Sequence, residues 1–332
     1  MKKKLIYILG TIFLFITIFY FYIGFYLANT ILKIEANCGL HEGSLPNTWS
    51  TFVDHHEYSV LVRSQLRKNF PFEKYHIDKW QDVYFPSRDK DIKISGWLFN
   101  YFSKRPIVIV VHGLFPNGKC KPESNLIASL LLKNKINVLT IDLRNYGNSS
   151  SVSKYENLGL SEYKDVLGAF DFLHQNGFEK HQIGLHGISL GGTSVIFAAE
   201  KEPSIKAVWL DSSLAEFKLI LKDEISRYGF PHDFGPAVSF AGKFLTGIDP
   251  TKLSPAFSLT KNQNYFFTHG DKDLRVLPHH FSFFQKYVKE KKIKANFWLA
   301  KNSYHVDAMF KYPDEYGLKM KEFFEDNLKK QL

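Results

Sequence analysis

The sequence opens with a long, uninterrupted apolar segment. Residues 5–32 contain no charged side chain, and Leu5 to Leu27 alone would extend about 35 Å as a helix, enough to cross a hydrocarbon core of about 30 Å. A signal peptide has a shorter apolar part that ends at a small-residue cleavage site, and a helix packed on a soluble domain would show an amphipathic pattern, which this segment lacks. We therefore predict that residues 1–32 form a cytoplasmic tip and an uncleaved transmembrane anchor.

Charges on either side of this segment predict its orientation. Lys2, Lys3 and Lys4 precede it, whereas Lys33 is the only lysine that flanks its other end. Because the more basic flank of a membrane helix stays in the cytoplasm, we expect a single-pass protein with a cytoplasmic N-terminus. The rest of the chain would then lie outside the cytoplasm, with the lipid bilayer as a partner of the helix.

The chain after the anchor falls into two parts. Residues 33–79 are mixed and polar, and we interpret them as a connector that contains one helix around His55 to Lys68. From residue 80 onward, short apolar runs alternate with helical stretches. The runs predict strands at Asp82–Phe85, Ile92–Asn100, Ile107–Val111, Val138–Ile141, Ile183–Leu185, Ala207–Leu210, Tyr265–Thr268 and Asn296–Leu299. The helices are expected at Ser124–Lys133, Ser161–Gln175, Thr193–Glu200, Pro278–Glu290 and Pro313–Leu328.

The continuous apolar composition of these runs predicts the fold class. Continuous apolar runs of this length are typical of strands buried on both faces of a parallel sheet. An antiparallel start followed by strand–helix alternation therefore predicts a doubly wound, mostly parallel α/β sheet over residues 80–332. Between Asp211 and Tyr265 the pattern has no clear strand and two helices, Glu216–Tyr228 and Ala237–Leu245. This interval is too long for a simple connection, so we predict a helical cap at about 212–261.

Charge and cysteine content indicate which classes of partner to expect. The net charge is +10, but the lysines are scattered and no base-reading motif accompanies them, so we do not expect a nucleic-acid partner. The two cysteines, Cys38 and Cys120, lack the spacing of a metal site. One disulfide or two free thiols both remain open for this pair.

The strongest chemical motif is Gly187-Ile188-Ser189-Leu190-Gly191-Gly192, which follows a predicted strand and precedes a predicted helix. This is the context of a nucleophile elbow, in which a serine on a tight turn projects its hydroxyl above the sheet. Glycines on either side let the strand and the helix approach closely, and the helix N-terminus adds partial positive charge. A glycine turn with an incidental serine is the alternative that this context disfavours.

Three further loops at strand ends supply the remaining groups. After the strand that ends at Val111, His112-Gly113-Leu114 predicts an oxyanion loop, so the donors would be the amides of Leu114 and Leu190. His112 fits a structural role equally well, and we do not assign it as the base. For the acid we favour Asp273 over Asp271 and Asp211, and for the base we choose His305, the one histidine that follows the last strand.

With these residues in place, the chain from Trp80 onward resembles α/β-hydrolases of the serine aminopeptidase-like and prolyl oligopeptidase-like branch, many of which carry an N-terminal membrane helix. Asp142-Leu143-Arg144-Asn145-Tyr146-Gly147-Asn148-Ser149 is similar to the family's Asp-x-Arg-x-x-Gly-x-Ser stretch, with Asn145 where many relatives have Gly. His269-Gly270-x-x-Asp273-x-x-Val276 is similar to its acid loop. The resemblance fades before Trp80 and in the insert.

The resemblance implies a serine hydrolase with a Ser-Asp-His triad that cleaves a small acyl-containing or peptide substrate without a metal or cofactor. It does not identify the bond, because this branch includes esterases, thioesterases, lipases, amidases and peptidases. We favour an esterase or lipase-like enzyme, with a peptidase or an inactive binding scaffold as the alternatives. Apolar positions of the insert would either line an acyl tunnel or pack the cap onto the core; they are Phe217, Leu219, Ile220, Leu221, Phe240, Phe244 and Leu245.

Overall fold

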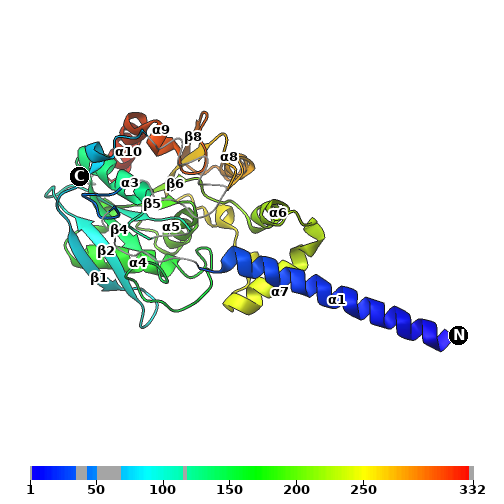
Figure 1. The fold of residues 1–332 in the computed structure, drawn as a ribbon. Coiled ribbons are helices and arrows are strands. Elements are labelled where there is room, and N and C mark those ends of the chain that lie inside the picture. The colour runs from blue at the N-terminus through cyan, green and yellow to red at the C-terminus, as the bar shows by residue number, and fades with distance from the viewer. Residues whose placement is uncertain (1, 35–42, 51–68, 115–117, 329–332) are drawn as a thin grey trace.

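The computed structural model describes residues 2–34, 43–50, 69–114 and 118–328, and its centre is an eight-stranded sheet (Figure 1). The strand order is β1-β2-β4-β3-β5-β6-β7-β8, with β1–β2 and β2–β4 antiparallel and the other neighbours parallel. The strands are β1 Gln81–Pro86, β2 Lys93–Phe99, β3 Ile107–Val111, β4 Asn137–Asp142, β5 Ile183–Ile188, β6 Ala207–Asp211, β7 Asn264–Gly270 and β8 Ala295–Ala300. The predicted doubly wound, mostly parallel sheet is thus confirmed.

Helices cover both faces of this sheet, which explains the continuous apolar runs. Along β3, Ile107, Ile109 and Val111 join one buried cluster and Val108 and Val110 join the other. The first cluster includes side chains of α4, α5 and α8, and the second those of α3, α9 and α10. These helices are α3 Pro122–Lys133, α4 Tyr163–Gln175, α5 Leu190–Lys201, α8 His279–Lys291, α9 Ala308–Lys311 and α10 Pro313–Asn327.

The predicted insert is helical. Residues 212–263, all of which the structure describes, contain helices and no strand between β6 and β7. The main elements are α6 (Phe217–Arg227) and α7 (Gly235–Thr246). The N-terminal helix α1 (Lys2–Leu32) packs beside α7 and then projects away from the domain (Figure 1). By length and composition, α1 is able to cross a membrane. The helix predicted around His55 to Lys68 lies outside the described residues.

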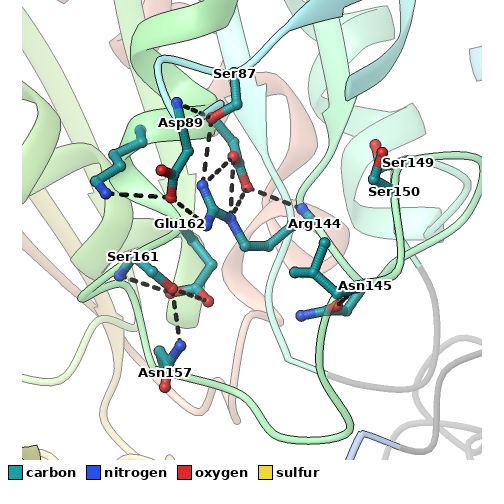
Figure 2. Close-up of polar contacts among 12 residues, drawn as sticks. Ser87, Asp89, Arg144, Asn145, Ser149, Ser150, Asn157, Ser161 and Glu162 are labelled. Atoms are coloured by element: carbon teal, nitrogen blue, oxygen red, sulfur yellow. Dashed lines mark hydrogen bonds and ion pairs between the residues drawn. The ribbon is translucent and has the colours of Figure 1, made fainter. Parts of the chain in front are cut away.

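A buried arginine fixes the loop that follows β4. Arg144 donates two hydrogen bonds to the buried carboxylate of Asp165, with Nη2 at 2.7 Å and Nε at 3.0 Å. Its other amino group reaches Asp89 at 2.9 Å, and Nη2 also lies 3.3 Å from Ser87 Oγ (Figure 2). One side chain therefore ties together the β1–β2 turn, the end of β4 and the first turn of α4. The arginine of the Asp-x-Arg motif therefore has a structural role, because it holds these three segments together.

Cys120, one of the two cysteines, is buried and disulfide-bonded. The other cysteine of the sequence, Cys38, lies outside the described residues. Cys120 stands just before α3, in the segment that follows the predicted oxyanion loop.

Candidate active site

Ser189 occupies a strained turn between β5 and α5. Its φ of 52° lies in the left-handed region that non-glycine residues rarely adopt. The turn is tight because the flanking glycines allow it: a Cβ on Gly187 would lie 2.5 Å from the carbonyl oxygen of Gly191, and a Cβ on Gly191 would lie 2.2 Å from that of Val111. Ser189 itself is half-buried, so part of the residue remains accessible.

The structure brings His305 and Asp273 to this serine. His305 Nε2 lies 3.0 Å from Ser189 Oγ, and His305 Nδ1 lies 2.7 Å from Asp273 Oδ2. Asp273 Oδ1 in turn accepts hydrogen bonds from the amides of Arg275 and Val276, at 2.8 and 2.9 Å. Serine, imidazole and carboxylate therefore form a continuous hydrogen-bonded relay, and two backbone amides hold the carboxylate of Asp273 in place.

Electrostatics keep the acid of this relay ionised. Burial alone would favour the neutral carboxyl, but the interactions with His305, His269 and the amide of Val276 together outweigh it, and the pKa of Asp273 falls below its ordinary value of 3.8. Ionised Asp273 is the form that can accept the Nδ1 proton of His305. That proton fixes the tautomer in which Nε2 faces Ser189 as an acceptor.

The two competing aspartates hydrogen-bond to other groups. Asp271 Oδ1 accepts a hydrogen bond from the amide of Ser303 at 3.3 Å, so it supports the loop below His305. Asp211 binds Tyr316 Oη at 2.7 Å and Ser212 Oγ at 2.8 Å. Burial raises the pKa of Asp211 to about 7. The geometry therefore singles out Asp273 as the partner of His305.

The residues predicted as oxyanion donors lie next to the nucleophile turn. Leu190 is the first residue of α5, and the first amides of a helix have no carbonyl partner within the helix. Gly113 packs against Ser189, since a Cβ built on it would lie 3.1 Å from Ser189 Cβ. Leu114 follows it directly, so its amide lies in the turn next to the nucleophile.

Two side chains that sequence reasoning did not assign orient this turn. His112 Nδ1 and Lys121 Nζ lie 2.8 and 3.3 Å from the carbonyl oxygen of Gly113, and Lys121 Nζ also donates to the carbonyl of Leu114 at 2.6 Å. The carbonyl of Gly113 and the N–H of Leu114 belong to one trans peptide and point in opposite directions. Holding the carbonyl therefore aims the Leu114 N–H the other way. Burial lowers the pKa of His112 to about 4, so this ring is neutral and structural.

We predict that Lys121→Met lowers kcat by a factor on the order of ten with KM little changed, because a misaimed oxyanion donor weakens binding of the transition state more than of the substrate. The measurement is steady-state hydrolysis of a soluble ester, with Lys121→Arg as the matched variant that keeps a cation. Recovery of kcat in Lys121→Arg supports the positioning role. Equal losses in both variants, in step with a lower melting temperature, would reduce Lys121 to a structural residue.

The loop that carries His305 is tied to the elbow through β6. The amide of Ser189 donates to the carbonyl of Asp211 at 2.7 Å, and the amide of Val306 donates to Ser212 Oγ at 3.1 Å. Asp211 and Ser212 thus connect the nucleophile turn with the base loop. No motif in the sequence marked this pair, because the contact joins residues that are distant along the chain.

One cluster among the described residues has the composition of a metal site: Asp223 on α6 with His279 and His280 at the start of α8. Its hydrogen bonds argue against metal binding. The amide of Ala215 donates to His280 Nδ1 at 3.0 Å, so the neutral ring carries its proton on Nε2 and donates it to Asp223 Oδ2, 3.2 Å away. The cluster is better explained as a contact that holds α6 to the start of α8.

The apolar positions of the insert divide between two neighbours. Phe217 and Ile220 are buried in a cluster with Phe197, Leu253 and Val276. Phe240 and Phe244 instead make ring contacts with α1 and remain exposed. Leu245 also joins the cluster around α1. Phe240 and Phe244 therefore fit neither expected role, lining an acyl tunnel or packing the cap onto the core, because their rings contact α1.

Comparisons with known proteins agree with this architecture. The sequence profile of the alpha/beta hydrolase fold family matches residues 106–254, which include the elbow. A thiohydrolase of Aspergillus aculeatus is 32% identical over 109 residues, which is 32% of this chain and 34% of the fungal protein. The chain thus matches only about a third of that relative's length.

Two solved structures extend the likeness to most of the chain. An esterase from Pyrococcus furiosus superposes with a TM-score of 0.61 at 20% identity, covering 79% of this chain and 97% of the esterase. An acylaminoacyl peptidase from Pyrococcus horikoshii superposes with a TM-score of 0.58 at 21% identity, covering 79% of this chain and 44% of the peptidase. Sheet order, elbow, profile and structural neighbours agree that the chain has the α/β-hydrolase fold.

Proposed function

We propose that the chain is a membrane-anchored serine hydrolase that uses Ser189, His305 and Asp273 as its catalytic triad. The observation that carries the proposal is the unbroken relay from Ser189 Oγ through His305 to Asp273, at 3.0 and 2.7 Å, on a strained and accessible turn. Backbone strain of this kind is costly and is retained where function requires it. An inactive scaffold would have no use for this geometry, which makes it the weaker alternative.

Each group has a defined step in the proposed reaction. Ser189 Oγ attacks the carbonyl carbon of the substrate while His305 Nε2 accepts the hydroxyl proton. The negative charge that develops on the carbonyl oxygen is bound by the amides of Leu114 and Leu190. His305 then gives the proton to the leaving group, and an acyl-enzyme remains. A water molecule, activated by the same imidazole, releases the acid and restores Ser189.

For the substrate we favour an acyl ester or thioester over a peptide. The relatives are divided between an esterase, a thiohydrolase and a peptidase, so they do not decide the bond. The position of the domain favours lipid-like acyl groups, because α1 would hold it at a bilayer and the cap helix α7 lies directly against α1. A peptidase remains the second candidate.

Purified protein should react with a fluorophosphonate probe and hydrolyse acyl esters faster than aminoacyl anilides. The probe mimics an attacked carbonyl and reports an activated serine, and the two substrate series separate an esterase from a peptidase. Fast anilide turnover with negligible ester turnover would replace the esterase by the peptidase. A chain that neither binds the probe nor turns over either series would be a binding scaffold.

The proposed topology has its own test. With Lys2, Lys3 and Lys4 in the cytoplasm, a reporter enzyme that is active only outside the cytoplasm should be active when fused to the C-terminus. The matched variant moves three lysines from before Leu5 to just after Leu32, which should lower the reporter signal. An inactive reporter on the native sequence, or a soluble product that starts after Leu27, would rule the topology out.

A further inference from the structure

Helix α6 of the insert contacts the loop that carries Asp273. Arg227, in the last turn of α6, donates from Nη2 to the carbonyl oxygens of Arg275 and Leu274, at 2.7 and 3.3 Å. Its other amino group, Nη1, donates to Glu224 Oε1 at 2.8 Å. Because the guanidinium is planar, the bond to Glu224 fixes the plane in which Nη2 faces the loop.

The two carbonyl groups that Arg227 holds belong to the peptides that bind Asp273. The carbonyl of Leu274 and the N–H of Arg275 lie on one peptide, and the carbonyl of Arg275 and the N–H of Val276 lie on the next. In a trans peptide the carbonyl and the N–H point in opposite directions. Both N–H groups donate to Asp273 Oδ1, at 2.8 and 2.9 Å. Arg227 therefore holds one side of both peptides, while Asp273 accepts hydrogen bonds from the other side.

The positive charge of Arg227 also strengthens these two hydrogen bonds. A cation beside a carbonyl oxygen polarises the peptide, and hydrogen bonds in a chain reinforce one another where the local dielectric is low. Asp273 is buried, so its carboxylate lies in such surroundings. The N–H groups of Arg275 and Val276 are thus better donors to Asp273 Oδ1 than they would be without the cation. Oδ2 remains for His305 Nδ1, which lies 2.7 Å away.

Contacts other than those of Arg227 hold α6 in place. Figure 1 shows α6 between α8 and the pair formed by α1 and α7. Asp223 Oδ2 lies 2.8 Å from His279 Nε2 at the start of α8. On the other side of the helix, Ile225 is buried in a cluster with Ile23 of α1. The helix is therefore fixed between α8 and α1, and Arg227 reaches the loop from a rigid support.

We propose that Arg227 is a positioning residue for the acid of the triad, because it orients the two peptides that bind Asp273. The inference rests on the proposed function, since it requires that Asp273 assists His305. Without Arg227 the two peptides can rotate, and Asp273 Oδ2 loses its fixed orientation toward His305. The insert thus contributes to catalysis through the acid loop, and this contribution does not require contact between α6 and the substrate.

The test uses the full-length protein in detergent micelles, and it measures the rate of fluorophosphonate labelling together with kcat and KM for a soluble ester. Arg227→Met removes every donor, so we expect kcat and the labelling rate to fall roughly tenfold with KM little changed. Arg227→Lys keeps a cation that can donate to both carbonyls and should recover most of this loss. Lys222→Met is the matched control, because Lys222 is an exposed cation on the same helix, and its rates should be unchanged.

A double-mutant cycle separates positioning from a general structural role. If Arg227 acts through Asp273, Arg227→Met should change the labelling rate by no more than about twofold in a chain that already carries Asp273→Asn. The full loss in that background would overturn the inference, because Arg227 would then act independently of the acid. Unchanged kcat in folded Arg227→Met would overturn it too, and so would equal losses in Arg227→Met and Arg227→Lys that follow a lower melting temperature.

The same cycle distinguishes this inference from the proposed function. If Asp273→Asn alone left the labelling rate unchanged, the triad assignment itself would fail. If Asp273→Asn lowered the rate and Arg227→Met did not, the triad would stand and only the positioning role would be lost. Should Arg227→Met not fold, Arg227→Gln takes its place in the cycle, because it also removes the charge and is expected to lose a similar factor.

Discussion

Ser189→Ala is expected to abolish fluorophosphonate labelling and to lower kcat by a factor on the order of 10⁴ or more. The loss is this large because the attacking oxygen is removed, while His305 and Asp273 keep their places. The fold should persist, since among the described residues Ser189 Oγ hydrogen-bonds to His305 alone and alanine keeps the Cβ. The measurements are probe labelling, ester turnover and thermal unfolding of the same preparation.

A serine on the helix that follows the turn supplies the control. Ser194 is buried on α5, and its hydroxyl lies 3.4 Å from the carbonyl of Leu190. Ser194→Ala should label and turn over substrate like the unmodified protein. Labelling that survives in Ser189→Ala would place the nucleophile elsewhere and overturn the catalytic assignment.

The sequence predicted the sheet well because its strands are buried on both faces. Runs such as Ile107–Val111 can be recognised without any knowledge of their neighbours. Boundaries differ by a few residues: the strand predicted as Ile183–Leu185 extends to Ile188, because its last residues pair with β6. Glycine and histidine at these positions, Gly187 and His186, break the apolar run while leaving the backbone in the sheet.

The candidate site was predictable where each group follows a strand. The carboxyl ends of parallel strands meet at one edge, so Ser189, Asp273 and His305 could be placed together from their positions alone. The side chains that support these three residues could not be predicted from the sequence. Nothing in the sequence distinguishes Lys121 from the other lysines, and only the fold brings its ammonium to the carbonyl of Gly113. The sequence already favoured Asp273 over Asp271, and in the structure it is Asp273 that lies 2.7 Å from His305.

The helices of the insert show what the pattern of apolar residues cannot predict. An apolar stripe on α7 indicates that the helix packs against another element, but it does not identify that element. Phe240 and Phe244 were compatible with a tunnel above the serine, and they lie on α1 because Gly24 and Ala237 let these two helices meet. Two residues without bulky side chains, more than two hundred positions apart, thus decide the orientation of the cap.

Asp273→Asn should lower kcat/KM by a factor on the order of 10⁴, the loss typical when a triad aspartate is neutralised. An asparagine at this position can turn its NH₂ group toward His305 Nδ1, which then acts as the acceptor. The imidazole proton would move to Nε2, and Nε2 could no longer take the proton of Ser189. Steady-state hydrolysis of a soluble ester across a range of pH measures the loss.

Asp271→Asn and Asp211→Asn are the matched variants, because both aspartates lie near the site and hydrogen-bond to groups other than the imidazole of His305. Each should retain ester turnover within a factor of about ten. If Asp211→Asn lost as much as Asp273→Asn with its melting temperature unchanged, the carboxylate at the end of β6 would take over the role of the acid.

The pH dependence of stability gives an independent check on Asp273. Its folded pKa lies below the ordinary value of 3.8, so the ionised carboxylate stabilises the fold above that value. This contribution is lost as the pH falls through the folded pKa. Asp273→Asn lacks a titrating group there, and its stability should fall less steeply than that of the unmodified protein at pH below about 4. Parallel stability curves for the two proteins would mean that His305 does not hold Asp273 in its ionised form.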